Sequence, residues 1–199
     1  MTIEKIIPYG KTRSKVLFDE GLVLMFYNGE IARMRLSEGS EVSDETYNRK
    51  MLPVLNKRAK ERLVYILKSS DKPEAELRRK LKESFYPEAV IDEAISWAKT
   101  KHYVDDKRFV ETYLRCHADG KSKKKLFYDL QAKGISKELI TLMLEETEIN
   151  ESEQIRAELA KKHFTYDMDE KEKQRIYASL ARKGYSWGAI QSAMHLEDF

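Results

Sequence analysis

The chain repeats itself at intervals of about 50 residues. The phrase LQAKGIS at 130–136 returns as LARKGYS at 180–186, with the glycine and the serine in the same places. An earlier copy has KESFYP at the corresponding bend, without the glycine, so we expect a different turn there. Such self-similarity predicts tandem helical units that bury their apolar faces on one another. Pairs of apolar residues recur with it at offsets of 49 and then 50: Leu77 and Leu81, Leu126 and Leu130, Ile176 and Leu180.

The middle copy carries signals for the ends of its helices. Asp105 and Asp106 precede a helical run, and short carboxylates suit the first turn of a helix. Adjacent carboxylates also suit a divalent metal, but no other ligand cluster lies nearby, so a helix start is favoured. Ser122 and Ser136 are placed to cap two further helices, and Gly134 supplies a left-handed stop between them. We therefore expect three short helices in each repeat.

These patterns predict a mainly α protein: an elongated array of three tandem three-helix repeats, preceded by a small antiparallel β element. The expected segments are a β extension at 1–42, a connecting helix at 43–56 and repeats at 57–105, 106–150 and 151–199. Pro53 is expected to break or kink the connecting helix. Helices are expected at 57–69, 73–84, 87–101, 105–117, 122–133, 136–148, 151–163, 169–183 and 186–196.

The first 42 residues have a different character from the rest. Runs that favour β structure lie at 16–18, 22–27 and 31–36, separated by Asp19-Glu20-Gly21 and by Asn28-Gly29. Asn-Gly readily adopts the positive dihedrals of a two-residue hairpin, so a hairpin turn is expected at 28–29. Because a small sheet is marginal alone, we expect it to pack on the first helix or against a partner.

Composition excludes several classes of protein. No run is long and apolar enough for a membrane span, and the first residues lack the features of a secretory signal, so a soluble, cytoplasmic protein is expected. The single cysteine, Cys116, excludes an internal disulfide and is expected to be a small buried residue. The four histidines show no ligand spacing. With no phosphate loop and no nucleophile beside a base, we expect no catalytic residue, no metal and no cofactor.

Basic residues concentrate in the middle repeat. Residues 115–137 include seven lysine or arginine side chains and two carboxylates, whereas 138–153 has no basic residue. Four of these lysines stand at a helix start, where cations oppose the helix dipole. That placement suits an anionic partner, although a solvated lysine-rich turn is equally consistent with it. The candidate binding residues are Arg108, Lys121, Lys123, Lys124, Lys125, Lys133, Lys137, Arg182 and Lys183.

Aromatic residues are interleaved with these cations, as in surfaces that stack nucleotide bases. They are Tyr113, Phe127, Tyr128 and Tyr185. At helical spacing, however, most aromatic side chains belong to a hydrophobic core, and a core role is favoured here.

HYVDDKRFVETYLR at 102–115, followed by GKSKKKLFYDLQAKGIS at 120–136, resembles the RecX family, bacterial regulators of the RecA recombinase. The likeness covers about residues 57–196. It implies an all-helical array that binds in the groove of the recombinase filament on single-stranded DNA and limits filament extension, strand exchange and co-protease activity, without catalysing a reaction. After Gly120 this chain has only lysines where the family often has arginine, and lysine supplies charge without the fork geometry that holds a phosphate or carboxylate by two hydrogen bonds.

The leading hypothesis is a non-enzymatic, monomeric regulator that modulates and mostly inhibits a RecA-type filament through the basic residues above, with single-stranded DNA contacted through the filament. Arg108 has an alternative role as an ordinary ion-pair partner of Glu111 or Glu61. Two alternatives remain: a sequence-nonspecific DNA-binding protein, and a protein-interaction scaffold that ignores nucleic acid. Salt-sensitive DNA binding by the protein alone would favour the first alternative, and DNA-independent binding to a partner would favour the second.

Overall fold

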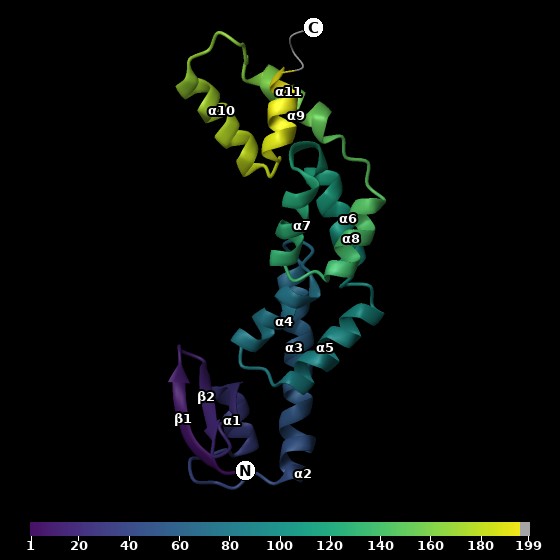
Figure 1. Ribbon diagram of the computed structural model, residues 1–199. Helices are drawn as coiled ribbons and strands as arrows, with labels where there is room; N and C mark the ends of the chain where they lie inside the picture. The colour runs from purple at the N-terminus through teal and green to yellow at the C-terminus, as the bar shows by residue number, and fades with distance from the viewer. Residues whose placement is uncertain (196–199) are drawn as a thin grey trace. The chain divides into compact units, whose positions relative to one another are not determined.

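The computed structural model describes residues 1–195, with side chains through Met194, and divides into two compact units (Figure 1). The first unit comprises residues 1–105, and the second begins at Asp106. The first holds the β element and one set of three helices, and the second holds two further sets. The mainly helical fold predicted from the repeat is confirmed, as is the small antiparallel sheet predicted from the β-favouring runs of the first 42 residues.

The sheet has three antiparallel strands in the order β1 (Ile3–Tyr9), β2 (Arg13–Phe18) and β3 (Val23–Tyr27). Strand β2 alternates, with Ser14, Val16 and Phe18 buried on one face. Strand β1 was not predicted. It is an edge strand and contains Pro8, a residue that edge positions tolerate because no ladder hydrogen bond is lost there.

The expected hairpin at Asn28-Gly29 and the strand at 31–36 are wrong. The chain instead forms helix α1 (Asn28–Met34). The carboxylate of Glu30 accepts the backbone N–H of Tyr27 at 2.8 Å and so caps the first turn. Ile31 and Met34, three residues apart, pack on the core, a spacing that belongs to a helix rather than a strand.

Pro53 does not end the helical segment that contains it. Helix α2 (Asp44–Thr46) continues through a π-helical stretch, η1 (Tyr47–Met51), into α3 (Leu52–Leu67), and Pro53 is the second residue of α3. Because the helical run is continuous, proline at this position removes a hydrogen bond that an α-helix would make, and the run departs from α geometry just before it: the Leu52 N–H donates to the Tyr47 carbonyl, five residues back. Helix α3 therefore begins before the position expected for the first repeat.

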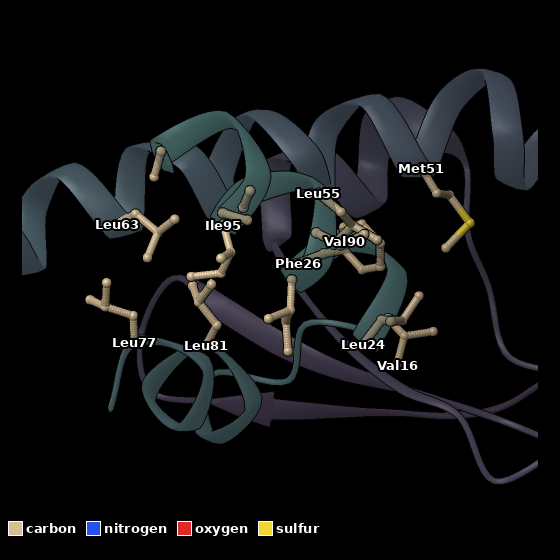
Figure 2. Packing of buried hydrophobic residues seen from close by; sticks show 14 of the residues in the cluster. Val16, Leu24, Phe26, Met51, Leu55, Leu63, Leu77, Leu81, Val90 and Ile95 are labelled. Carbon is tan, nitrogen blue, oxygen red and sulfur yellow. The ribbon is translucent and has the colours of Figure 1, made fainter. Parts of the chain in front are cut away.

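The core of the first unit joins the sheet to three helices, α3, α4 (Glu74–Glu83) and α5 (Glu88–Thr100). Figure 2 shows Phe26 of the sheet among side chains of these helices. Along α3 the fully buried residues Leu55, Ala59 and Leu63 recur every four positions and form the stripe that faces this core. The sheet thus gains its stability from the first three-helix repeat.

The second unit contains two hydrophobic cores, one for each set of three helices. All nine helices predicted for the repeats are present in the described chain, with ends within a few residues of those expected. The helices of the second unit are α6 (Asp106–His117), α7 (Lys123–Ala132), α8 (Lys137–Glu145), α9 (Glu151–Lys161), α10 (Glu170–Arg182) and α11 (Trp187–His195), with a short 3-10 turn, η2 (Ala118–Gly120), after α6.

Cys116 is exposed, so its predicted burial is wrong. The residues of α6 that face the core are Val110 and Leu114, at 0% and 3% exposure. The apolar stripe of α6 therefore runs one position later than Phe109 and Tyr113, which are only partly buried. Cys116 lies off this stripe because it is two residues from Leu114 on a helix of 3.6 residues per turn.

The same left-handed turn separates the second and third helices of every repeat. Gly134 and Gly184 have φ of 85° and 92°, and Phe85 has φ of 63° at the equivalent position of the first repeat. The expectation of a different turn there is wrong. The backbone N–H of Tyr86 donates to the Leu81 carbonyl, which ends the helix without glycine.

Candidate functional site

The carboxylate of Asp129 on α7 organises the basic region of the second repeat. Its Oδ2 atom lies 2.8 Å from Nζ of Lys121, and its Oδ1 atom lies 2.9 Å from Nζ of Lys125. The hydroxyl of Tyr113 on α6 donates to Oδ2 at 3.2 Å. Two of the four clustered lysines are therefore held by ion pairs within their own repeat.

An aromatic ladder on α6 lies beside this carboxylate. The rings of Tyr113 and His117 stack with centroids 4.1 Å apart, and those of Phe109 and Tyr113 with centroids 6.4 Å apart. The Nζ atoms of Lys121 and Lys133 lie 5.3 and 5.7 Å from the centroid of the Tyr113 ring, within range of cation–π attraction. Tyr113 thus draws two of the predicted basic residues together.

The ionisation of Asp129 is set by two opposing effects. Partial burial disfavours the charged carboxylate, but the hydrogen bonds from Lys121 and Lys125 outweigh it, so the pKa of Asp129 lies below its ordinary value. Burial likewise opposes the charge of Lys121, yet its contacts with Asp129 and Tyr113 raise its pKa overall. Asp129 and Lys121 are therefore both charged at neutral pH.

Asp129→Asn is expected to destabilise the protein by about 1 kcal/mol at pH 7, since the lysines lose their counter-charge. A carboxylate with a lowered folded-state pKa stabilises the fold above its unfolded pKa of about 4, and this contribution disappears as the pH falls through the folded-state value. Urea unfolding of both proteins at pH 7 and pH 3 checks this. The difference should be smaller at pH 3, and an equal difference at both would contradict the ion-pair account.

Lys123 and Lys124, the first two residues of α7, point to solvent instead. The backbone at this helix start is satisfied without them: Ser122 Oγ accepts the N–H of Lys125 at 3.1 Å, and Glu151 Oε1 accepts the N–H of Lys123 at 2.8 Å. The two lysines border a shallow pocket of about 300 Å³ whose apolar lining includes Phe127 and Leu144. The ammonium groups are thus available to a partner.

The third repeat packs directly against the start of α7. The backbone N–H of Ser122 donates to the carbonyl of Lys183 at 3.1 Å. At Gly184 an added Cβ would lie 2.4 Å from Ser122 Oγ and 2.6 Å from Lys125 Cβ. The side chain of Lys183 forms an ion pair with Glu158, so this predicted binding residue also has an internal partner.

Tyr185 is structural. It is only 4% exposed, and its hydroxyl donates to Gln154 Oε1 at 2.8 Å, while Gln154 Nε2 donates to the carbonyl of Ala118 at 2.7 Å. Burial raises the pKa of Tyr185 to about 12, so the hydroxyl keeps its proton. This chain of hydrogen bonds connects the second repeat to the third, and the alternative of base stacking is excluded for Tyr185.

The other predicted residues are spread over several elements. Lys133 follows α7, Lys137 begins α8 and Arg182 ends α10, and all three are exposed. Arg108 is half-buried near the start of α6. The structure therefore brings Lys121, Lys125 and Lys133 together around Tyr113 and Asp129, and it does not gather the nine candidates into one cluster.

Sequence reasoning missed three residues that shape this region: Asp129, His117 and Glu151. The spacing of Lys125 and Asp129, four residues apart on one helix, is a signal that predicts their ion pair. The stacking of His117 on Tyr113 follows from the same spacing on α6. No local signal links Glu151 to the start of α7, because the two belong to different repeats.

Metal-binding and membrane-spanning features were sought across residues 1–195. In that range no group of three or more His, Cys, Asp or Glu side chains is arranged to hold a metal ion. None of the helices described is long and apolar enough to cross a membrane.

Each of the three repeats matches a domain of known proteins. Models of the first, second and third three-helix domains of RecX match residues 59–97, 105–144 and 150–194, in that order along the chain. A "Regulatory protein RecX" of Haemophilus influenzae (strain PittGG) is 34% identical over 127 residues, which span 62% of this chain and 84% of that protein. The chain belongs to the RecX family.

Other RecX proteins match more of the sequence. The one of Caldanaerobacter subterraneus subsp. tengcongensis is 28% identical over 200 residues, covering 98% of this chain and all of that protein. The one of Clostridium acetobutylicum is 32% identical over 66% of this chain, which spans 65% of that protein's length. A solved structure, "Crystal structure of regulatory protein RecX", shares the fold at a TM-score of 0.60 with 20% identity, covering 96% of this chain and 98% of that one. Membership of RecX, a family of regulatory proteins, supports a regulatory role.

Proposed function

We propose that this chain is a non-enzymatic regulator that binds a RecA-type recombinase filament on single-stranded DNA and mostly inhibits its recombination, ATPase and co-protease activities. The observation that carries the proposal is the presence of all three RecX domains in order along one chain. A regulator of a filament needs a surface for an extended, negatively charged assembly, and the exposed lysines of the second repeat suit that role.

Within this proposal the basic residues divide by their surroundings. Lys121 and Lys125 position the start of α7 through Asp129, and Lys183 does so through its backbone carbonyl. Lys123 and Lys124, both exposed beside an apolar pocket, are the residues we propose to contact the partner. An apolar hollow bordered by two lysines and by one carboxylate, Glu145, suits a protein surface that carries acidic side chains around an apolar side chain.

The test is the binding of the fluorescently labelled chain to a preassembled recombinase filament on single-stranded DNA. Recombinase without DNA and DNA without recombinase are the two control arms. The proposal predicts that the filament binds at least tenfold more tightly than either component, because it presents a surface that neither component has alone. Equal affinity for bare DNA and for the filament would contradict it and favour a nonspecific DNA-binding protein.

A further inference from the structure

Two adjoining hollows on the first unit are lined by arginine, lysine and tyrosine. They have volumes of about 400 and 540 Å³ and share Arg62 and Tyr65 of α3. The first is completed by Arg13 and Tyr27 of the sheet and by Tyr86 of the α4–α5 loop. We call the two hollows together the α3 groove. Three residues that line the α3 groove lie outside the segments that the RecX domain models match: Arg13, Tyr27 and Arg58.

Arg58 forms the fixed wall of the α3 groove. Its side chain is only 14% exposed, its guanidinium donates to the Met25 carbonyl at 3.1 Å and to Glu30 Oε2 at 3.0 Å, and it lies 4.3 Å from the Tyr27 ring centroid. Burial raises the pKa of Tyr86, against the opposing effect of Arg58 and Arg62, so its hydroxyl remains a hydrogen-bond donor. The groove therefore has a preformed polar floor.

The charge of the α3 groove is strongly positive. Its lining has one carboxylate, Glu61, against six cations: Arg13, Arg58, Arg62, Lys68, Lys72 and Lys80. Lys72 and Lys80 approach Glu76 at 3.7 and 3.9 Å. Within residues 1–195, Arg13, Arg62 and Lys68 form no ion pair. An uncompensated positive groove attracts a polyanion.

Tyr65 distinguishes between polyanions. Its side chain is 66% exposed, and the Arg62 guanidinium lies 5.5 Å from its ring centroid. An acidic peptide needs only the cations for binding. A nucleic-acid strand carries phosphates that bind the arginine guanidinium groups and also bases that stack on an exposed ring. Exposed tyrosine beside unpaired arginine thus favours the second ligand.

We propose that the α3 groove binds the phosphate backbone of single-stranded nucleic acid, with Tyr65 as the stacking platform for one base. This contact needs no recombinase and involves no residue of the α7 region. This proposal goes beyond the proposed function, and an experiment can contradict either one without contradicting the other.

The test is fluorescence anisotropy of labelled oligothymidylate with the full chain, without recombinase, over a range of salt concentrations. Arg13→Ala with Arg62→Ala should weaken binding at least tenfold and flatten the salt dependence, since each lost phosphate contact lowers the slope by about 0.7. Tyr65→Ala should weaken binding about tenfold, whereas Tyr65→Phe, which keeps the ring, should bind like the unsubstituted chain. These side chains are exposed, so the fold is retained.

Arg49→Ala is the matched control, because Arg49 is an exposed arginine of the same unit that pairs with Glu45 and does not line the groove. It should change affinity less than twofold. The proposal is overturned if the unsubstituted chain does not bind the oligonucleotide, or if the Arg13 and Arg62 variant binds it normally. It is also overturned if the variants lose binding to an oligoglutamate peptide and keep binding to oligothymidylate, since the occupant would then be a polypeptide.

Discussion

Replacing Gly184 with alanine is expected to destabilise the second unit by about 2–4 kcal/mol. The residue has φ of 92°, where any side chain is strained, and the new Cβ would meet Ser122 Oγ and Lys125 Cβ at 2.4 and 2.6 Å. Neither atom can move freely, because Ser122 caps α7 and the Cβ of Lys125 is fixed by the helix backbone. The third repeat would therefore lose its close contact with α7.

Gly188→Ala provides the control for that substitution. Gly188 lies in the first turn of α11, and an added Cβ would meet nothing within 4 Å. Alanine should leave stability unchanged or raise it by up to about 1 kcal/mol, because it is the better helix former. Urea unfolding followed by circular dichroism compares the three proteins. Equal stability of the Gly184 variant and the unsubstituted chain would contradict the close packing of α7 on the 184 turn.

Reversing the charges of Lys123 and Lys124 to glutamate is expected to raise, at least tenfold, the concentration needed to inhibit recombinase ATP turnover. Both ammonium groups are exposed, and charge reversal against an anionic partner replaces attraction with repulsion. The fold should survive, because acidic residues suit the first turn of a helix. Steady-state ATP hydrolysis on single-stranded DNA measures the effect.

The matched control for this pair is Lys171→Glu with Arg175→Glu. These residues are exposed on α10 of the same unit, and their reversal changes the net charge equally. Inhibition should change less than twofold. Equal losses in both variants would show that overall charge, rather than the start of α7, determines inhibition.

The sequence predicted the repeats well because their signals are local. Ser122 and Ser136 cap the helices that they were expected to cap, and Gly134 adopts the expected left-handed turn. Apolar spacing placed all nine helices of the repeats, since each helix buries a stripe that its own sequence defines. Local rules thus sufficed where local contacts decide the structure.

Errors arose where distant residues decide the structure. Asn28-Gly29 begins a helix because Glu30, which caps it, also pairs with Arg58 of α3 at 3.0 Å. Phe85 adopts a left-handed turn that glycine fills elsewhere, and its ring lies against Lys15 of the sheet. Neither partner can be inferred from the neighbouring sequence.

The candidate site was only partly predictable for the same reason. The lysine cluster was visible in the sequence, but its division into paired and exposed members depends on Tyr113 and Asp129, which come from two helices. The α3 groove was not predicted, because its cations come from the sheet, α3, the α3–α4 loop and α4 and form no run in the sequence.

ATP hydrolysis by the cognate recombinase on single-stranded DNA, with this chain titrated in, tests the central claim most directly. A regulator that acts on the filament should lower the rate at well below one copy per recombinase, because one bound copy affects many recombinase protomers. An unchanged rate at equimolar chain, under conditions in which the chain is folded, would contradict the proposed function and leave RecX membership as evidence of fold alone.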